Sequence, residues 1–185
     1  MRSAISRYTK GKVFVVIDAA NLESSVKDLD WWVDYVKLCE LFDGGNLYGI
    51  RFYCVHHNTE NQDKFFVFLK HHGYTLVTKP LKIIKQADIE AGDIRKANFD
   101  VEIAVDAISM MEEFATFILF SGDSDFNYLL RHLKKKGKIT IVVSAKHHIA
   151  KELVETSDKY IDLRRLQSFI ERKRQNKSPS FATGG

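Results

Sequence analysis

The residues that could carry chemistry lie where apolar runs stop at acidic residues. The apolar run of residues 117–120 ends at a Ser-Gly-Asp-Ser-Asp turn that contains Asp123 and Asp125. The earlier run of residues 13–17 ends directly at Asp18. In open α/β sheets, ligands bind in the crevice outside the carboxyl ends of the strands. If the two runs are neighbouring parallel strands, Asp18 and Asp123 meet at that edge.

A third acid, Asp100, opens a helical pattern and can complete this set. Carboxylates that converge repel one another, so they either share protons or hold a cation. Oxygen ligands without histidine or cysteine favour Mg²⁺ or Mn²⁺ over zinc. Such an ion commonly polarises a phosphate and activates water for in-line attack. The acidic set therefore predicts metal-dependent phosphoryl chemistry.

Polar neighbours extend the predicted site. Asn21 follows Asp18 by three residues and can hydrogen-bond a ligand carboxylate or the attacking water, while Ser121 and Ser124 can orient the ligands from outside. Ordinary helix capping also explains Asp and Ser at a strand-to-helix turn. That alternative stays open, above all for Asp125, which could equally favour the helix dipole.

The surrounding pattern alternates strands and helices. Strands are predicted at residues 13–17, 47–55, 74–78, 117–120 and 138–143, with an edge strand at 160–163. Helices are predicted at residues 31–42, 61–71, 99–114, 126–133, 150–154 and 166–171, with a tight turn at 19–21. Residues 79–98 read as a long loop at the rim, with room for a strand or flap. This order predicts a three-layer α/β/α fold with a mainly parallel central sheet.

The helix at residues 99–114 has two stripes. Val101, Val105 and Ile108 belong to the stripe expected to face the core. Asp106 belongs to the polar stripe, and it lies about 240° around the helix from Asp100. We therefore expect Asp106 to face solvent rather than to share a metal ion with Asp100.

Composition sets the broad class of protein. The 185 residues are 45% hydrophobic and suffice for one domain, predicted at residues 11–171 between an N-terminal extension of residues 1–10 and a disordered tail of residues 172–185. No apolar run has the length of a membrane span or a signal-peptide core, so a cytoplasmic location is the default expectation. The two cysteines, Cys39 and Cys54, have no metal-site spacing and are expected to be reduced. The net charge of +4 favours polyanions mildly.

Four segments resemble one known family. They are VFVVIDAANLE (residues 13–23), KANFDVEIAVDAI (96–108), LFSGDSDFNYLLRHLKKKGKITIVV (119–143) and LVETSDKYIDL (153–163). In this order they are similar to the NYN domain family, specifically its LabA-like (DUF88) branch within the PIN-like nuclease superfamily. Ala19 departs from the glycine that many members carry.

The resemblance implies a PIN-like, Rossmannoid α/β/α fold and a metal-dependent ribonuclease, which is expected to cut within the RNA strand. It implies an acidic pocket of Asp18, Asp100, Asp123 and Asp125 that holds Mg²⁺ or Mn²⁺ beside Asn21. The family pattern also includes Asp106, so its role stays open. RNA is the expected partner, with Lys96 and Lys146 as hypothesised contacts to its backbone; a homo-oligomer stays open, and no membrane contact is expected.

Two other functions remain as alternatives. The first is an RNA-binding or regulatory protein that uses this fold without cleaving. The second is a phosphatase or phosphotransferase that uses Asp18 as the nucleophile. Enzymes of the second kind carry an Asp-x-Asp motif after the first strand, whereas position 20 here is Ala20.

Overall fold

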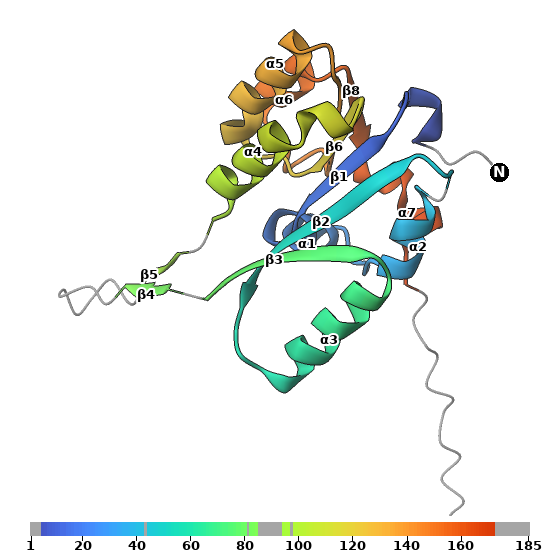
Figure 1. The fold of residues 1–185 in the computed structure, drawn as a ribbon. Coiled ribbons are helices and arrows are strands. Elements are labelled where there is room, and N and C mark those ends of the chain that lie inside the picture. Colours follow the sequence, from blue (N-terminus) through green and yellow to red (C-terminus); the bar gives the residue numbers. More distant parts are fainter. Residues whose placement is uncertain (1–4, 43, 81, 85–93, 97, 173–185) are drawn as a thin grey trace, which may run out of the picture.

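A six-stranded sheet forms the centre of the computed structural model, which describes residues 5–42, 44–80, 82–84, 94–96 and 98–172 (Figure 1). The strand order is β3-β2-β1-β6-β7-β8, and every neighbouring pair is parallel. The strands are β1 (Val13–Asp18), β2 (Leu47–His56), β3 (Tyr74–Pro80), β6 (Thr116–Phe120), β7 (Ile139–Ser144) and β8 (Lys159–Asp162). This confirms the predicted α/β/α class with a parallel central sheet.

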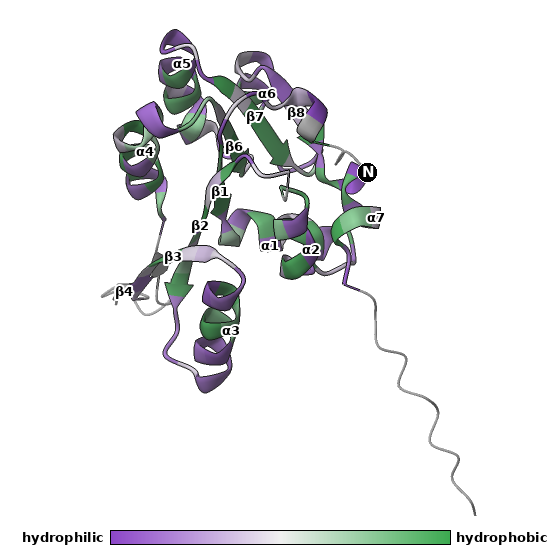
Figure 2. Cartoon of the chain, turned by 45° about the vertical axis from the view of Figure 1, so that its right-hand side comes forward, coloured by the Kyte–Doolittle hydropathy of each residue, from purple (hydrophilic) through white to green (hydrophobic). Residues whose placement is uncertain are grey.

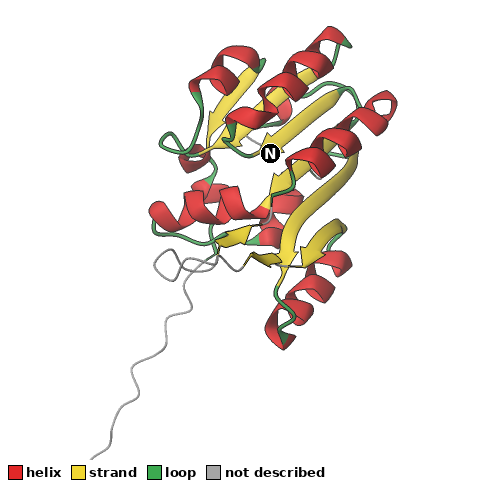
Figure 3. Cartoon of the chain, turned by 90° about the vertical axis from the view of Figure 1, so that its left-hand side faces the viewer, coloured by secondary structure: helices red, strands yellow, loops and turns green. Residues whose placement is uncertain are grey.

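Helices cover both faces of the sheet (Figure 3). One face packs against α1 (Ala19–Asp28), α2 (Tyr35–Glu40), α3 (Glu60–His71) and α7 (Gln167–Ile170). The other packs against α4 (Asp100–Ser109), α5 (Asn127–Lys135) and α6 (Lys151–Thr156). Short 3₁₀ turns are η1 (Ser6–Tyr8), η2 (Met111–Glu113), η3 (Ser124–Phe126) and η4 (Leu163–Arg165).

The central strands are apolar on both faces, as the hydropathy colouring of Figure 2 makes visible. In β1, Val15 and Ile17 belong to the core under α1, whereas Phe14 and Val16 belong to the core under α4 and α5. Successive side chains of a strand point to opposite faces, so a sheet covered on both sides needs continuous apolar runs. The predicted strands were recognisable for that reason.

The chain changes its direction of winding between β1 and β6. β1 pairs with β2 on one side and with β6 on the other, with Ile17 opposite Phe120. This is the topological switch point, where an open α/β sheet leaves a crevice at its carboxyl edge. Asp18 and Ser121, the residues that follow this pair, therefore start the two chain segments that border the crevice.

The first helix corrects the sequence prediction. Residues 19–21 were expected to form a tight turn, but they are the first turn of α1, and α2 is a short helix rather than a helix over residues 31–42. Asp18 caps α1 by accepting a hydrogen bond from the backbone amide of Asn21 at 3.3 Å. A residue after the strand thus serves as a helix cap, which the turn interpretation did not include.

The orientation of α4 is a second correction. Ile103 and Ala107 are the buried residues of this helix, whereas Val101, Val105 and Ile108, expected in the core, are exposed. Hydrophobic periodicity assumes that the larger apolar stripe faces inward. Here a narrower face with the small side chain of Ala107 packs on the sheet.

The stretch at residues 79–98 contains a short hairpin. β4 (Lys82–Ile84) pairs antiparallel with β5 (Ile94–Lys96), which agrees with the expected strand in this loop. Residues 85–93 and 173–185 lie outside the described residues, so the flap expected within residues 79–98 and the disordered tail predicted at residues 172–185 remain predictions. The predicted domain limits remain predictions, although Ile5 is fully buried against the core.

Two expectations from composition can be compared with the structure. Cys39 and Cys54 are free thiols, as predicted. Among the described residues, no helix combines the length and the apolar character needed to cross a membrane.

Gly122 gives a test of the fold at the switch point. A Cβ atom at this position would lie 1.7 Å from the backbone carbonyl oxygen of His148, so Gly122→Ala must displace backbone. We expect it to lower the free energy of unfolding by about 1–3 kcal/mol, the usual cost of overpacking. The control is Gly49→Ala, because a Cβ there meets nothing within 4 Å. Equal urea midpoints for the two variants would contradict this close packing.

Candidate active site

One pocket collects most of the predicted acidic set. It has a volume of about 480 Å³, and Asp18, Asn21, Asp100 and Asp123 all line it. These residues come from the end of β1, the first turn of α1, the start of α4 and the turn after β6. The structure thus brings together residues that are separated by more than a hundred positions in the chain.

Asp18 lies at the centre of the interactions within the pocket. Its Oδ1 accepts from the amide of Asn21, and the hydroxyl of Ser121 donates to its Oδ2 at 3.4 Å. Burial raises the pKa of Asp18, the nearby charges of Asp100 and Asp123 raise it further, and the two hydrogen bonds oppose the rise. Without a bound cation, the charged form of Asp18 is therefore disfavoured.

Asp100 faces the same pocket from the first turn of α4. The side-chain amide of Asn98 donates to its Oδ2 at 2.7 Å. Burial and the charges of Asp123 and Asp125 raise the pKa of Asp100, and Lys79 opposes this shift. Two carboxyl groups of the pocket thus carry a raised pKa, chiefly because they are partly buried and also because other acids lie near them.

The turn after β6 divides its polar residues between different roles. Asp123 lines the pocket and also caps η3, because its Oδ1 accepts from the amide of Asp125 at 3.0 Å. Ser121 is buried, and its hydroxyl oxygen accepts from the amide of Asp123 at 3.3 Å while donating to Asp18. Asp125 and Ser124 are exposed and do not line the pocket. Asp125 therefore acts on the site through its charge.

Asn21 joins the two segments at the switch point. Its side-chain oxygen accepts from the backbone amide of Gly122 at 3.0 Å. The carbonyl oxygen of Gly122 in turn accepts from the amide of Ala150 at 2.9 Å. Asn21 thus fixes the start of α1 against the turn that carries Asp123, in addition to lining the pocket.

The donor chemistry of the pocket fits a hard divalent cation. Asp18, Asp100 and Asp123 offer carboxylate oxygens, and the pKa values of Asp18 and Asp100 are raised by burial and by neighbouring acids, both of which a bound cation would offset. In the part of the chain that the structure describes, no three His, Cys, Asp or Glu side chains lie close enough together to hold an ion at once. Mg²⁺ usually takes only one or two carboxylates and keeps several waters. The donor set therefore suits Mg²⁺ or Mn²⁺ without forming a closed cage.

Asp106 does not join the acidic pocket, and the expectation that it faces solvent is wrong. Its side chain is only 25% exposed and forms an ion pair with Arg51. It also accepts a hydrogen bond of 2.7 Å from the hydroxyl of Tyr53, a buried residue whose other atoms line the pocket. Asp106 therefore supports the wall of the pocket from behind.

Several residues that surround the acids were not among the site residues predicted from the sequence. Lys79 binds the carbonyl oxygen of Asn98 at 3.0 Å and Glu102 at 2.5 Å, which places a cation near Asp100. His148 lines the pocket and contacts Asp28 at 2.7 Å. Lys79 and Asn98 lie in the stretch without periodicity; Asn98 is only two residues from Asp100, whereas tertiary contacts alone bring Lys79 close to it.

Among the side chains that the structure describes, neither of the two lysines predicted to contact RNA lies in the acidic pocket. Lys146 is exposed after β7 and does not line the acidic pocket. Lys96 ends β5, and its side chain lies outside the described part of the structure. Their contacts to RNA remain predictions.

A parallel sheet covered by helices on both faces, with carboxylates at its switch point, places this chain among the open α/β proteins with a candidate ligand site at the carboxyl edge. The family model of the NYN domain matches residues 12–166. The chain therefore belongs to the NYN domain family, as its four sequence motifs predicted.

Two known proteins extend this comparison. The low amplitude and bright protein LabA of Synechococcus elongatus is 30% identical over 168 residues, which are 89% of this chain and 90% of LabA. A crystal structure of a protein of unknown function from Vibrio parahaemolyticus superposes with a TM-score of 0.72 at 22% identity, covering 92% of this chain and 99% of that one. The second similarity supports the fold alone.

Replacing Asp18 by Asn is expected to stabilise the metal-free protein at neutral pH. Asn preserves the cap of α1 but removes the charge that burial disfavours. The protonated form of Asp18 stabilises the fold fully below the unfolded pKa of about 3.9, and this contribution is lost as the pH rises through the raised folded pKa. The advantage of Asp18→Asn over wild type should therefore grow from about pH 4 to pH 7.

Urea unfolding in EDTA at several pH values measures this difference. Glu113→Gln serves as the control, because Glu113 is an exposed acid on η2, outside the pocket. If the stability advantage of Asp18→Asn stays constant across the pH range, the pKa of Asp18 is not raised in the folded protein.

Proposed function

We propose that this protein is a metal-dependent endoribonuclease, which cleaves phosphodiester bonds within an RNA strand. One observation carries the proposal: Asp18, Asp100 and Asp123 line a single pocket at the switch point of a parallel sheet. Membership of the nuclease-like NYN family supports it. A site of oxygen donors alone suits the cations used in phosphoryl chemistry.

The acidic residues have distinct proposed roles. Asp18 and Asp123 would hold Mg²⁺ or Mn²⁺, Asp100 would contact the ion through a bound water, and Asp125 would add negative charge from the rim. When bound, the ion would polarise the scissile phosphate and lower the pKa of a water molecule. Ser121 orients Asp18 and the turn of Asp123 through its two hydrogen bonds.

Basic side chains near the pocket would hold the RNA backbone. Lys79 lies beside Asp100, and His148 lines the pocket itself. Lys96 and Lys146 stay candidates for more distant phosphate contacts. The net charge of +4 assists the approach of a polyanion. The cytoplasm remains the expected location, and a homo-oligomer remains open.

An RNA-binding or regulatory role without cleavage is the second candidate. The name of the cyanobacterial relative, low amplitude and bright protein LabA, describes no catalytic activity. In that case the acidic pocket would bind a cation and RNA without turnover. A phosphatase with Asp18 as nucleophile is less well supported, because Ala20 replaces the second acid of that motif.

Cleavage of labelled RNA in the presence of Mn²⁺ tests the proposal. We expect Asp18→Asn and Asp123→Asn each to reduce the cleavage rate by roughly 100-fold or more, since even residues that only orient metal ligands cost about 10–100-fold. Glu113→Gln should cleave like the wild type, and circular dichroism should show that all variants are folded.

The products decide between the candidates. Equal cleavage by wild type and both Asp variants would indicate a contaminating nuclease and refute the proposal. Tight RNA binding by the wild type without any products would instead favour the regulatory role.

A further inference from the structure

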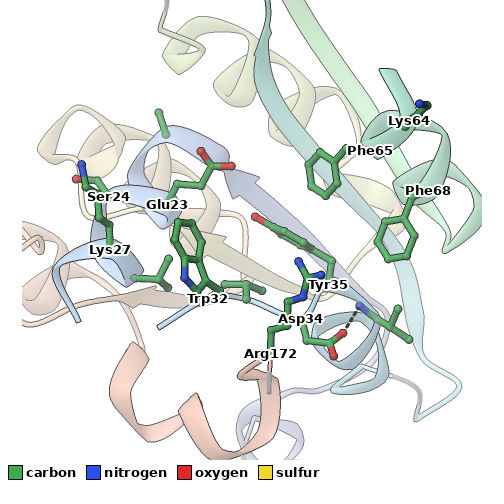
Figure 4. A pocket seen from close by; sticks show the side chains of 14 residues that line it. Glu23, Ser24, Lys27, Trp32, Asp34, Tyr35, Lys64, Phe65, Phe68 and Arg172 are labelled. Atoms are coloured by element: carbon green, nitrogen blue, oxygen red, sulfur yellow. Dashed lines mark hydrogen bonds between the residues drawn. The ribbon is translucent and has the colours of Figure 1, made fainter. Parts of the chain in front are cut away.

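A second and larger groove adjoins the acidic pocket (Figure 4). Its volume is about 960 Å³, and its walls come from α1, the segment that leads into α2, α3 and the residue after α7. Ala20, Glu23, Ser24 and Phe65 line both cavities. The two cavities therefore share part of one wall, formed by α1 and α3.

Aromatic side chains dominate the groove. Trp32 is 63% exposed and Phe68 is 38% exposed, although both are large apolar residues. The rings of Phe65 and Phe68 are nearly parallel, at 17°, with centroids 6.3 Å apart. In Figure 4, both rings project from α3 on one side of the groove, with Tyr35 between them and Trp32. Exposed apolar groups that gather in a hollow indicate a binding site.

The backbone holds Trp32 in its exposed position. Trp31 and Val33, its two neighbours, are buried in the core. The carbonyl oxygen of Trp32 accepts from the amide of Arg172 at 2.8 Å, and Val33 forms a bridge with Glu171. The indole is therefore presented from a fixed segment, which reduces the entropy lost when a ligand stacks on it.

Cations accompany the aromatic rings. Lys27, Lys64 and Arg172 line the groove, and Lys64 pairs with Glu60 at 2.6 Å. Within the described ranges, neither Lys27 nor Arg172 forms an ion pair through its side chain. Cations interleaved with aromatic faces are the pattern that binds a nucleic acid strand through its phosphates and bases.

Two acidic residues, Glu23 and Asp34, line the groove beside these cations. Asp34 is already engaged, because its Oδ1 accepts from the amides of Val36 and Lys37 and its Oδ2 lies 3.6 Å from the Lys37 ammonium group. Glu23 is the remaining carboxylate, and it lies on the wall shared with the acidic pocket. Negative charge is thus concentrated toward the acidic pocket, and the free cations lie in the groove.

We propose that this groove is a stacking platform for the bases of single-stranded RNA next to the scissile phosphate. This inference rests on the proposed ribonuclease function and names its substrate class. Bases within a duplex are stacked on each other and cannot reach Trp32 and Phe68, whereas unpaired bases can. The platform therefore selects unpaired strands.

Binding of a short fluorescent RNA in EDTA tests the platform without cleavage. We expect Trp32→Ala and Phe68→Ala each to weaken single-strand binding at least about fivefold, the lower limit for loss of one stacked base. Trp32→Phe should retain most of the affinity because it keeps an aromatic face. Tyr48→Ala is the matched control: Tyr48 is 39% exposed, lies near the amino end of β2 and does not line the groove. The same RNA annealed to its complement should bind more weakly than the single strand.

Two results would overturn the platform. The first is an unchanged affinity of Trp32→Ala and Phe68→Ala, which would leave the groove to another occupant such as a protein segment. The second is equal affinity for single strand and duplex, because a platform for bases requires unpaired ones. Neither result affects the cleavage assay, in which Asp18→Asn and Asp123→Asn report on the acidic pocket. Failure of the platform and failure of the nuclease can therefore be told apart.

Discussion

The partial burial of carboxylates at the switch point is the constraint that the rest of this structure accommodates. Asp18 is held between the end of β1 and the turn after β6, and its charge meets those of Asp100 and Asp123. Burial raises the pKa of Asp18 and of Asp100, and neighbouring acids raise both further, so stability alone does not explain carboxylates at this edge of the sheet. The apolar core on both faces of the sheet offsets the free-energy cost of these carboxylates and keeps them in place. Carboxyl groups with raised pKa values that lie together in a cleft are typical of a functional site.

Much of this arrangement could be predicted from the sequence. Runs such as residues 13–17 and 117–120 are apolar at every position, which a doubly covered parallel strand requires. Once those strands were placed, the carboxyl-edge rule brought Asp18 and Asp123 together. Their shared pocket agrees with that prediction. The sequence also predicted Asp100 at the start of a helix, and Asp100 is the first residue of α4.

The remainder depended on three-dimensional packing. α1 was missed because few of its residues are apolar and Ala19 directly follows the strand. The orientation of α4 was wrong because its buried face relies on Ile103 and the small Ala107, while larger apolar side chains face outward. Lys79 gained its place near Asp100 through tertiary contacts that no local pattern encodes. The aromatic groove joins residues from both ends of the chain, as Trp32 and Arg172 illustrate.

The central claim is that the acidic pocket binds a divalent cation. The most direct measurement is an anomalous difference map from crystals soaked in Mn²⁺. The account predicts a peak within coordination distance of Asp18 and Asp123, with Asp100 or its bound water as a further ligand, and no such peak in Asp18→Asn crystals. A saturating soak that leaves this pocket empty, or a peak that persists in Asp18→Asn, would contradict the account.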